Sequence, residues 1–241
     1  MRADKLKGSP RYALFVPRSY DPNKPTPLVI GLHGGGAGGA DGKLVVGAGW
    51  NAMSFYLRPC NARDWICACP TALRPGWDGP ANDALIDALL DELRGLFNID
   101  ENRIYLVGHS MGGAGVWAQG PRLAGTWAAV AAASSYAVSG IPRLLESRTG
   151  VYVYHSDDDP RVPVADLRRA VEKFTTSDAD LVLDLRHGFK HAFPSDIVET
   201  IFAFFDRHAR GTPRSSFARP RLRTNGATFR RWHDPTAQSA S

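Results

Sequence analysis

The chain has 241 residues, of which 44% are hydrophobic and 22% are charged, and its formal net charge is +5. This length and apolar content suit one globular domain with a buried core, and no internal repeat is visible. No run approaches the ~18 apolar residues of a membrane span, and the first eight residues lack the apolar segment of a secretory signal. We therefore expect a cytoplasmic protein without a membrane span, with secretion as the alternative if a leader has been removed.

Two apolar segments near the N-terminus predict strands of one sheet. Residues 11–17 are expected to begin the sheet at an antiparallel edge, and residues 27–32 form a short apolar run typical of a buried strand. The second run leads into a glycine-rich loop. Glycine lets backbone N–H groups come close to a reacting carbonyl oxygen, so we expect part of an oxyanion hole at Gly34, Gly35 and Gly36. A phosphate-binding loop is the alternative, which is disfavoured because no Gly-Lys-Ser/Thr follows.

Aromatic side chains in the next segments predict a helix and a substrate-binding surface. Trp50, Phe55 and Tyr56 have the spacing of an amphipathic helix. We expect Trp50 and Trp77 to contact the substrate. For Trp77 the reason is its loop, residues 74–80, which holds the indole between Pro-Gly and Asp-Gly-Pro turns with little core to join. The alternative for each aromatic residue is burial in the core.

A strand and a helix are predicted between this loop and the middle of the chain. Residues 65–69 form another apolar run. Asn82 and Asp83 are expected to cap a helix, because Asn and Asp side chains accept the free N–H groups of a first turn. The apolar face of this helix would consist of Ile86, Leu90, Leu93 and Phe97.

The three cysteines, Cys60, Cys67 and Cys69, lack the spacing of a zinc site or of a Cys-x-x-Cys redox site. Cys67 and Cys69 are expected to point to opposite faces of the strand. We therefore expect buried thiols and no metal.

A glycine-flanked serine follows the next apolar run and is the strongest functional signal in the chain. Residues 103–107 predict a strand, which leads into Gly108-His109-Ser110-Met111-Gly112. The flanking glycines permit a sharp strand-to-helix turn that leaves the serine hydroxyl projecting. We therefore expect Ser110 to be a nucleophile, the N–H of Met111 to join the oxyanion hole, and His109 to contact the substrate. A buried structural serine is the alternative.

The second half of the chain continues as alternating strands and helices, which predicts a mainly parallel sheet. Strands are expected at residues 128–133, 151–155 and 181–185, and helices at residues 167–174 and 197–205. A turn after the second of these strands carries Asp157, Asp158 and Asp159, and the loop after the third carries His187 and His191. A carboxylate would orient an imidazole that accepts the serine proton. The residues alone leave open which aspartate and which histidine do so.

Segments 33–36, 108–113, 155–163 and 188–194 together resemble the α/β-hydrolase superfamily, in the group of serine esterases that includes carboxylesterases, dienelactone hydrolases and polyhydroxybutyrate depolymerase-like esterases. The resemblance covers about residues 10–209. It implies an α/β-hydrolase fold, with a mostly parallel central sheet and helices on both faces. Only 49 positions separate Ser110 from Asp159, so we expect no separate cap domain between them. The resemblance also implies that Asp159, directly before Pro160, is the acid and that His191 is the base. Ser156 stands where the family commonly has glycine.

The activity implied by this resemblance is hydrolysis of carboxylic esters by a Ser110-His191-Asp159 triad through an acyl-enzyme, without a cofactor. The substrate would be a small-molecule or oligomeric ester. Two alternatives remain: an acyltransferase or peptidase that uses the same triad, and a non-catalytic binding protein on the same fold.

The C-terminal residues differ from the rest of the chain in charge. Residues 210–241 carry seven arginines and one acid, Asp234, so their net charge is +6 and that of residues 1–209 is −1. They are rich in Pro, Ser and Thr and lack periodicity. This predicts an extended or disordered basic tail behind a catalytic domain of residues 1–209. Nucleic-acid binding is disfavoured despite the charge.

Overall fold

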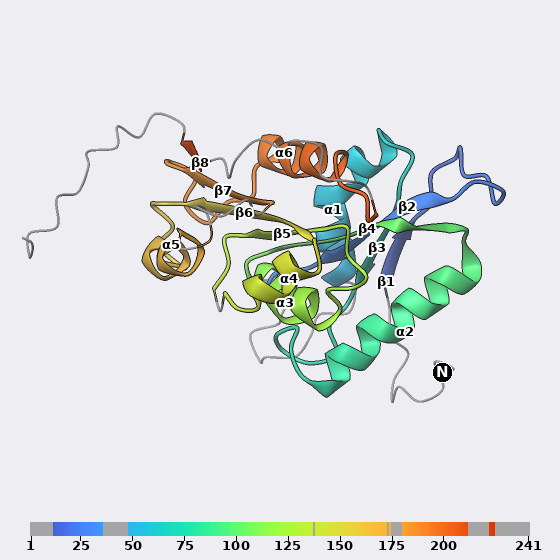
Figure 1. The fold of residues 1–241 in the computed structure, drawn as a ribbon, viewed down its shortest axis with the longest axis horizontal. Helices are drawn as coiled ribbons and strands as arrows, with labels where there is room; N and C mark the ends of the chain where they lie inside the picture. The colour runs from blue at the N-terminus through green and yellow to red at the C-terminus, as the bar shows by residue number, and fades with distance from the viewer. Residues whose placement is uncertain are drawn as a thin grey trace, which may run out of the picture.

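The computed structural model describes residues 12–35, 48–136, 138–172, 174, 180–211 and 222–224. The strands are β1 Tyr12–Phe15, β2 Thr26–Leu32, β3 Ile66–Pro70, β4 Ile99–His109, β5 Ala129–Ala133, β6 Gly150–Ser156, β7 Leu181–Arg186 and β8 Leu222–Thr224. They form one eight-stranded sheet in the order β1-β3-β2-β4-β5-β6-β7-β8 (Figure 1). β1 pairs antiparallel with β3, and the other neighbouring strands pair parallel.

Helices cover both faces of this sheet (Figure 1). They are α1 Ala48–Asn61, α2 Pro80–Leu96, α3 Met111–Arg122, α4 Ile141–Glu146, α5 Val164–Glu172 and α6 Ser195–Phe205. α1 and α6 lie on one face, and α2, α3, α4 and α5 lie on the other. The predicted sheet, mostly parallel and covered on both sides, is confirmed. In the described part of the chain between β4 and β6, α3, β5 and α4 follow one another with short connections and no inserted domain.

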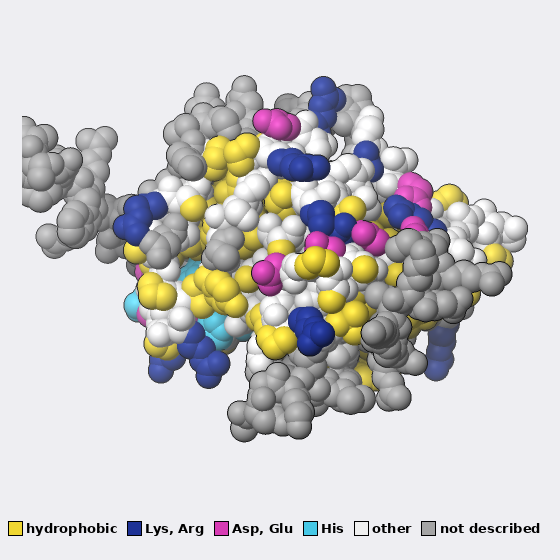
Figure 2. Space-filling model, turned by 90° about the horizontal axis from the view of Figure 1, so that it is seen from below, with side chains coloured by type: hydrophobic (Ala, Val, Ile, Leu, Met, Phe, Trp, Pro, Cys, Tyr) yellow, Lys and Arg dark blue, Asp and Glu magenta, His cyan; other side chains and the backbone are white. Residues whose placement is uncertain are grey.

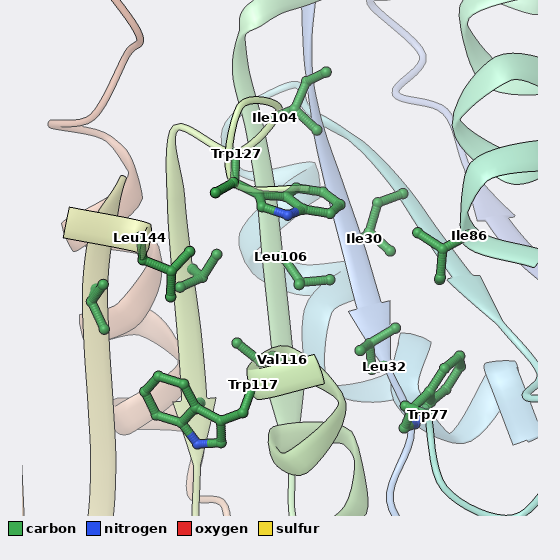
Figure 3. Packing of buried hydrophobic residues seen from close by; sticks show 14 of the residues in the cluster. Ile30, Leu32, Trp77, Ile86, Ile104, Leu106, Val116, Trp117, Trp127 and Leu144 are labelled. Atoms are coloured by element: carbon green, nitrogen blue, oxygen red, sulfur yellow. The ribbon is translucent and has the colours of Figure 1, made fainter. Parts of the chain in front are cut away.

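The central strands contribute to two cores because side chains alternate along a strand. In β2, Leu28 and Ile30 belong to the core under α2 and α3, whereas Val29 belongs to the core under α1 and α6. Figure 3 shows the first of these cores, where Ile30 and Leu106 lie among Ile86 and Trp127. All seven residues of β2 are buried, which explains its continuous apolar run.

The predicted cap of α2 is wrong. The helix begins at Pro80 and has no side-chain cap hydrogen bond. Proline suits the first turn of a helix because the missing N–H would have no helical partner there. Asn82 is instead fully buried, and its amide holds the preceding loop: Oδ1 accepts the N–H of Leu73, and Nδ2 donates to the carbonyl of Arg74.

All three cysteines are free and buried, as expected. The expectation that Cys67 and Cys69 point to opposite faces is wrong, because residues two apart on a strand share a face. Their Sγ atoms lie 3.8 Å apart in the core under α1.

Two elements have no counterpart in the sequence-based predictions. One is the short helix α4. The other is β8, which lies within the basic C-terminal segment and pairs parallel with β7, with Leu222 opposite Leu183. The other residues beyond 211, and Gly36 of the glycine-rich loop, lie outside the described residues. Among the helices that the structure describes, none is both long and apolar enough to cross a membrane.

Candidate active site

Ser110 lies in a strained turn between β4 and α3. Its φ of 58° and ψ of −120° are uncommon for a residue with a side chain. The flanking glycines make this turn possible. A Cβ on Gly108 would lie 2.2 Å from the carbonyl oxygen of Gly112, and a Cβ on Gly112 would lie 2.2 Å from that of Leu32. The Ser110 N–H donates to the carbonyl of Ala133 at 2.9 Å, which ties the turn to β5.

His191 lies between Ser110 and Asp159. Its Nε2 is 2.8 Å from Ser110 Oγ, and its Nδ1 is 2.7 Å from Asp159 Oδ2. Because an ionised carboxylate only accepts hydrogen bonds, we assign the ring proton to Nδ1, so that Nε2 accepts from the serine hydroxyl. The other carboxylate oxygen, Oδ1, accepts the N–H groups of Arg161 at 2.8 Å and Val162 at 3.0 Å.

Asp159 is held in its charged form. Burial raises the pKa of its carboxyl group, but hydrogen bonds from His191, Val162 and Arg161 outweigh burial and hold the pKa below its usual value. The Asp159 side chain is fully buried, whereas that of His191 is 13% exposed. The negative charge of Asp159 is therefore buried, whereas the His191 ring that it contacts is partly exposed.

The other candidate acids and base lie outside this contact. Asp157 Oδ1 is 2.7 Å from Nδ1 of His187, whose side chain is 68% exposed. Asp158 Oδ1 accepts the N–H groups of Gly188 and Lys190, each at 3.1 Å, and the hydroxyl of Ser156 at 2.5 Å. Ligand atoms of Asp157, Asp158 and His187 lie within 4.8 Å of one another. Exposed acidic groups of this kind are common without a metal ion, and these oxygens already have protein partners.

Ser156 was singled out in the sequence only as a departure from glycine. Its hydroxyl donates to Asp158 and also accepts the N–H of Phe189 at 3.2 Å. Together with the Asp158 contacts, this joins the loop of Asp159 to the loop of His191. The sequence around the three consecutive aspartates does not indicate this role of Ser156, because the role depends on the contact between two loops.

The first glycines of the loop after β2 pack against the serine turn. A Cβ on Gly34 would lie 3.6 Å from Cβ of Ser110, and one on Gly35 would lie 3.7 Å from Cβ of Met111. His33 holds this loop in place with two hydrogen bonds. Its Nε2 accepts the N–H of Ala72 at 3.1 Å, so its Nδ1 donates to the carbonyl of Gly34 at 3.0 Å. Burial lowers the pKa of His33, which favours the neutral ring that these bonds require.

The expectation that Trp77 contacts substrate is wrong. Its indole is only 1% exposed, and its Nε1 donates to the carbonyl of His33 at 3.0 Å. The side chain occupies space left by Gly115 of α3, where a Cβ would lie 2.6 Å from Cγ of Trp77. Trp77 thus supports the glycine-rich loop from inside the core. The missing side chain at position 115 was a signal in the sequence that could have indicated this packing.

A cavity of about 160 Å³ opens beside Gly34 on the side of α1. Trp50 is 65% exposed and does not line it, contrary to the expected role of this residue, whereas Phe55 and Tyr56 of the same helix do. His109 lines the cavity as well. Of the predicted substrate contacts, His109 is therefore the one that the structure places at a cavity.

His109 is held in a neutral state. Its ring stacks on Phe193, with centroids 5.1 Å apart and an interplanar angle of 4°. Burial, followed by the charge of His191, lowers the pKa of His109 to about 4.

Comparison with known proteins agrees with the fold that the structure shows. Residues 72–209 match the dienelactone hydrolase family. The chain is similar to a probable feruloyl esterase C of Aspergillus terreus, with 29% identity over 133 residues, which are 54% of this chain and 47% of that protein. It is similar to feruloyl esterase C of Emericella nidulans at the same identity over 132 residues, with the same coverage. The chain thus spans about half the length of these relatives.

Solved structures show the same fold. A thermostable esterase matches with a TM-score of 0.70 at 24% identity, over 83% of this chain and 59% of that one. A ferulic acid esterase matches with a TM-score of 0.64 at 18% identity, over 84% of this chain and 93% of that one. The α/β-hydrolase fold is therefore confirmed, and the chain belongs to the dienelactone hydrolase family.

Proposed function

We propose that this protein hydrolyses carboxylic esters, with Ser110 as nucleophile, His191 as general base and Asp159 as the acid that orients the base. The observation that carries the proposal is the position of His191, 2.8 Å from Ser110 Oγ and 2.7 Å from Asp159 Oδ2. The esterase relatives and the family match support the reaction class.

The contacts define the roles in the reaction. Asp159 holds the Nδ1 proton of His191, so the lone pair of Nε2 accepts the proton of Ser110 as Oγ attacks the ester carbonyl. His191 then protonates the departing alcohol, and water releases the acyl group by the reverse sequence.

Backbone N–H groups would receive the negative charge that develops on the carbonyl oxygen. The N–H of Met111 belongs to the first turn of α3, where N–H groups have no helical partner, and Gly34 and Gly35 pack against this turn. Each such donor contributes about 3 kcal/mol to stabilisation of the transition state. We propose these N–H groups, together with that of Gly36, as the oxyanion hole.

The nucleophile is tested by Ser110→Ala, with Ser147→Ala as a matched control in an exposed position at the opposite end of the sheet. We expect Ser110→Ala to lower kcat for p-nitrophenyl acetate by about 10⁴ or more and to abolish labelling by a fluorophosphonate probe. Ser147→Ala should keep both. Hydrolysis by a folded Ser110→Ala protein at the wild-type rate would overturn the proposal.

The reaction class is tested with matched acyl donors. The protein should cleave p-nitrophenyl esters and fail to cleave the corresponding p-nitroanilides, and added alcohols should not divert the acyl group from water. Equal cleavage of the anilides would indicate a peptidase. Transfer to the alcohol as the main product would indicate an acyltransferase.

A further inference from the structure

His155 is a buried titratable residue that the proposed reaction leaves unused. It lies near the end of β6, four residues before Asp159, and its side chain is fully buried. Nε2 of His155 is 2.8 Å from the carbonyl oxygen of Val162 and 3.7 Å from Oδ2 of Asp159. Oδ2 is also the oxygen that contacts Nδ1 of His191. A second histidine therefore lies beside the carboxylate that orients the proposed base.

The contact with Val162 determines which nitrogen of His155 carries the proton. A carbonyl oxygen only accepts hydrogen bonds, so Nε2 is the donor. Nδ1 is inaccessible to solvent and has no hydrogen-bond partner among the described residues. A proton on Nδ1 would therefore be a buried N–H group without an acceptor, which costs free energy. Burial also lowers the pKa of His155, so the ring is neutral at pH 7 with its proton on Nε2.

Val162 connects His155 to Asp159. The N–H of Val162 donates to Oδ1 of Asp159 at 3.0 Å, and its carbonyl oxygen accepts the Nε2 proton of His155 at 2.8 Å. The N–H of Arg161 donates to the same carboxylate oxygen at 2.8 Å. The bond from His155 ties this turn to β6. Loss of that bond would free the Val162 peptide, and the carboxylate that it holds, to move relative to His191.

The neutral state of His155 matters for the charge of Asp159. A charged imidazolium 3.7 Å from Oδ2 would compete with His191 for the negative charge of this carboxylate. A neutral ring holds the turn without such competition. The full charge of Asp159 thus remains available to stabilise the imidazolium that forms on His191 when the serine loses its proton.

We propose that His155 is a positioning residue of this site: its Nε2–H holds the carbonyl of Val162 and thereby fixes the orientation of the Asp159 carboxylate. Because its side chain is fully buried, His155 acts through Asp159 and does not touch the substrate. This inference rests on the proposed ester hydrolysis, because it concerns the acid of the same triad.

Two substitutions separate the hydrogen bond of His155 from the bulk of its ring. His155→Phe keeps a flat ring but loses the donor, so we expect kcat for p-nitrophenyl acetate to fall about tenfold. KM should stay within about twofold, because the proposed base acts in both formation and hydrolysis of the acyl-enzyme. In His155→Gln, the side-chain amide can donate to Val162, so kcat should return to within about threefold of wild type. A folded His155→Phe protein with wild-type kcat would overturn the proposal.

His208→Phe is the matched control. His208 is also buried, and its Nδ1 donates to the carbonyl of Phe204 at 2.6 Å. It packs on Gly150 at the other end of β6, where a Cβ would lie 2.5 Å from Cδ2 of His208. This variant should lose stability in urea unfolding but keep kcat within about twofold of wild type. An equal loss of kcat in His208→Phe would show that the effect is not specific to His155 and would overturn its role.

A double-mutant cycle tests whether His155 acts through Asp159. In the Asp159→Asn background, His155→Phe should lower kcat by less than about twofold, because the carboxylate that it positions is already absent. A further loss of about tenfold in that background would show that His155 acts by another route, contrary to the proposal.

A spectroscopic measurement separates this inference from the proposed reaction. In Ser110→Ala protein with ¹⁵N-labelled histidine, the His155 resonances should show a proton on Nε2 and none on Nδ1 at pH 7, whether or not any His155 variant folds. In the same background, His155→Phe should shift the Nδ1 proton resonance of His191, and His155→Gln should restore it. If wild-type protein cleaves no ester but these shifts occur, the proposed function fails and the positioning role stands. If esters are cleaved but His155 carries its proton on Nδ1, the positioning role fails.

Discussion

At the scale of single residues, three consecutive aspartates in one turn have three different environments. Asp159 contacts His191, Asp157 contacts the exposed His187, and Asp158 accepts backbone N–H groups from the loop that carries both histidines. The backbone of the turn distinguishes these aspartates. Among the three, only the Asp159 carboxylate is fully buried and accepts the N–H groups of Arg161 and Val162. Its position is therefore fixed on both oxygens.

Replacing Asp159 should separate orientation of His191 from the other parts of the site. In Asp159→Asn, the amide can donate to Nδ1 and so favours the tautomer with the proton on Nε2, which cannot accept the serine proton. We expect kcat for p-nitrophenyl acetate to fall by about 10⁴. The early burst of p-nitrophenol, which reports acylation of the enzyme, should slow in parallel. Rapid-mixing kinetics with this ester would measure both quantities.

Asp157→Asn is the matched control, because it changes the neighbouring carboxylate in the same way. It removes only the negative charge beside His187, whose side chain is solvent-exposed and does not contact Ser110, so kcat should stay within about twofold of wild type. A large loss in Asp157→Asn with little loss in Asp159→Asn would reverse the assignment of the acid.

The neutral state of His109 has a consequence for stability. Its pKa is about 4 in the folded protein and ~6.5 in an unfolded chain, so the unfolded state binds more protons between these values. The free energy of unfolding should therefore decrease as the pH falls from 6.5 towards 4, by up to about 3 kcal/mol from this group.

Denaturant unfolding of wild type and His109→Phe at pH 7 and pH 4.5 would measure this effect. His33 and His155, whose pKa values are also lowered by burial, are present in both proteins and cancel in the comparison. We expect the wild-type protein to lose more stability between the two pH values than His109→Phe. An equal loss in both would show that His109 is already protonated at pH 4.5 without cost.

Patterns in the sequence indicate residues well where local geometry determines the role, and less well where tertiary packing does. Ser110 could be singled out because the strained turn requires glycine on both sides of it. Trp77 was misread because its partners, His33 and Gly115, come from two other segments, and turns rich in Pro and Gly resemble an exposed loop. The position of a side chain relative to distant segments is not encoded in its neighbours.

At the scale of elements, α3 packs closely on the loop that precedes α2. Gly115 in α3 faces Trp77, and Gln119 one turn later donates to the carbonyl of Trp77 at 2.6 Å. Trp77 in turn donates to the carbonyl of His33. The helix that begins at the nucleophile therefore also supports the opposite wall of the site.

Two helical glycines offer a matched pair of substitutions. Gly115→Ala should destabilise the protein by about 1–3 kcal/mol, because the new Cβ would lie 2.6 Å from the Trp77 side chain. Gly95→Ala in α2 meets nothing within 4 Å and should stabilise it by about 0.5–1 kcal/mol through helix propensity. Urea unfolding measures both changes, and a Gly115→Ala protein as stable as wild type would show that Trp77 is not tightly packed against α3.

Helices and strands could be predicted from the sequence where the apolar pattern extended over enough residues. The buried strands β2 and β6 and the second half of β4, residues 104–107, contain continuous apolar runs, and α6 places Ile197, Ile201 and Phe205 on one face. α4 was not predicted because six residues are too few to show a helical period. β8 was not predicted because three residues in a basic, Pro-rich segment carry no strand signal, and their pairing depends on the free edge of β7.

At the scale of the whole molecule, parallel pairing explains how distant residues meet. Ser110 follows β4, Asp159 follows β6, and His191 follows β7, and the carboxyl ends of parallel strands lie along one edge of a sheet. This is why a serine and a histidine 81 positions apart can form a hydrogen bond. The order of the strands in the sheet, however, required the structure, because sequence shows only their order along the chain.

Charge is distributed unevenly between this sheet domain and the C-terminal segment. On the face that carries α2 and α3, basic and acidic side chains lie next to one another (Figure 2). One ion pair joins the two helices, with Arg122 of α3 2.8 Å from Asp87 of α2. By contrast, residues 210–241 have a net charge of +6. We therefore propose that residues 1–209 act as the catalytic domain and that the basic segment is an appendage to it.

Deletion of residues 212–241 tests this division. All the contacts among Ser110, Asp159 and His191 lie within the retained part, so kcat/KM for p-nitrophenyl acetate should stay within about twofold of wild type. The loss of β8 leaves the edge of β7 unpaired, so we expect a greater tendency to aggregate, measured by light scattering. Residues 212–241 carry six arginines and one acid, so their removal takes away a net charge of +5 and should also abolish salt-dependent retention on an anionic resin. If the truncated protein folds but loses its esterase activity, the segment belongs to the catalytic unit.

A salt-sensitive shift of DNA in a gel, present in the full chain and absent after deletion, would instead reveal a nucleic-acid-binding role for the segment.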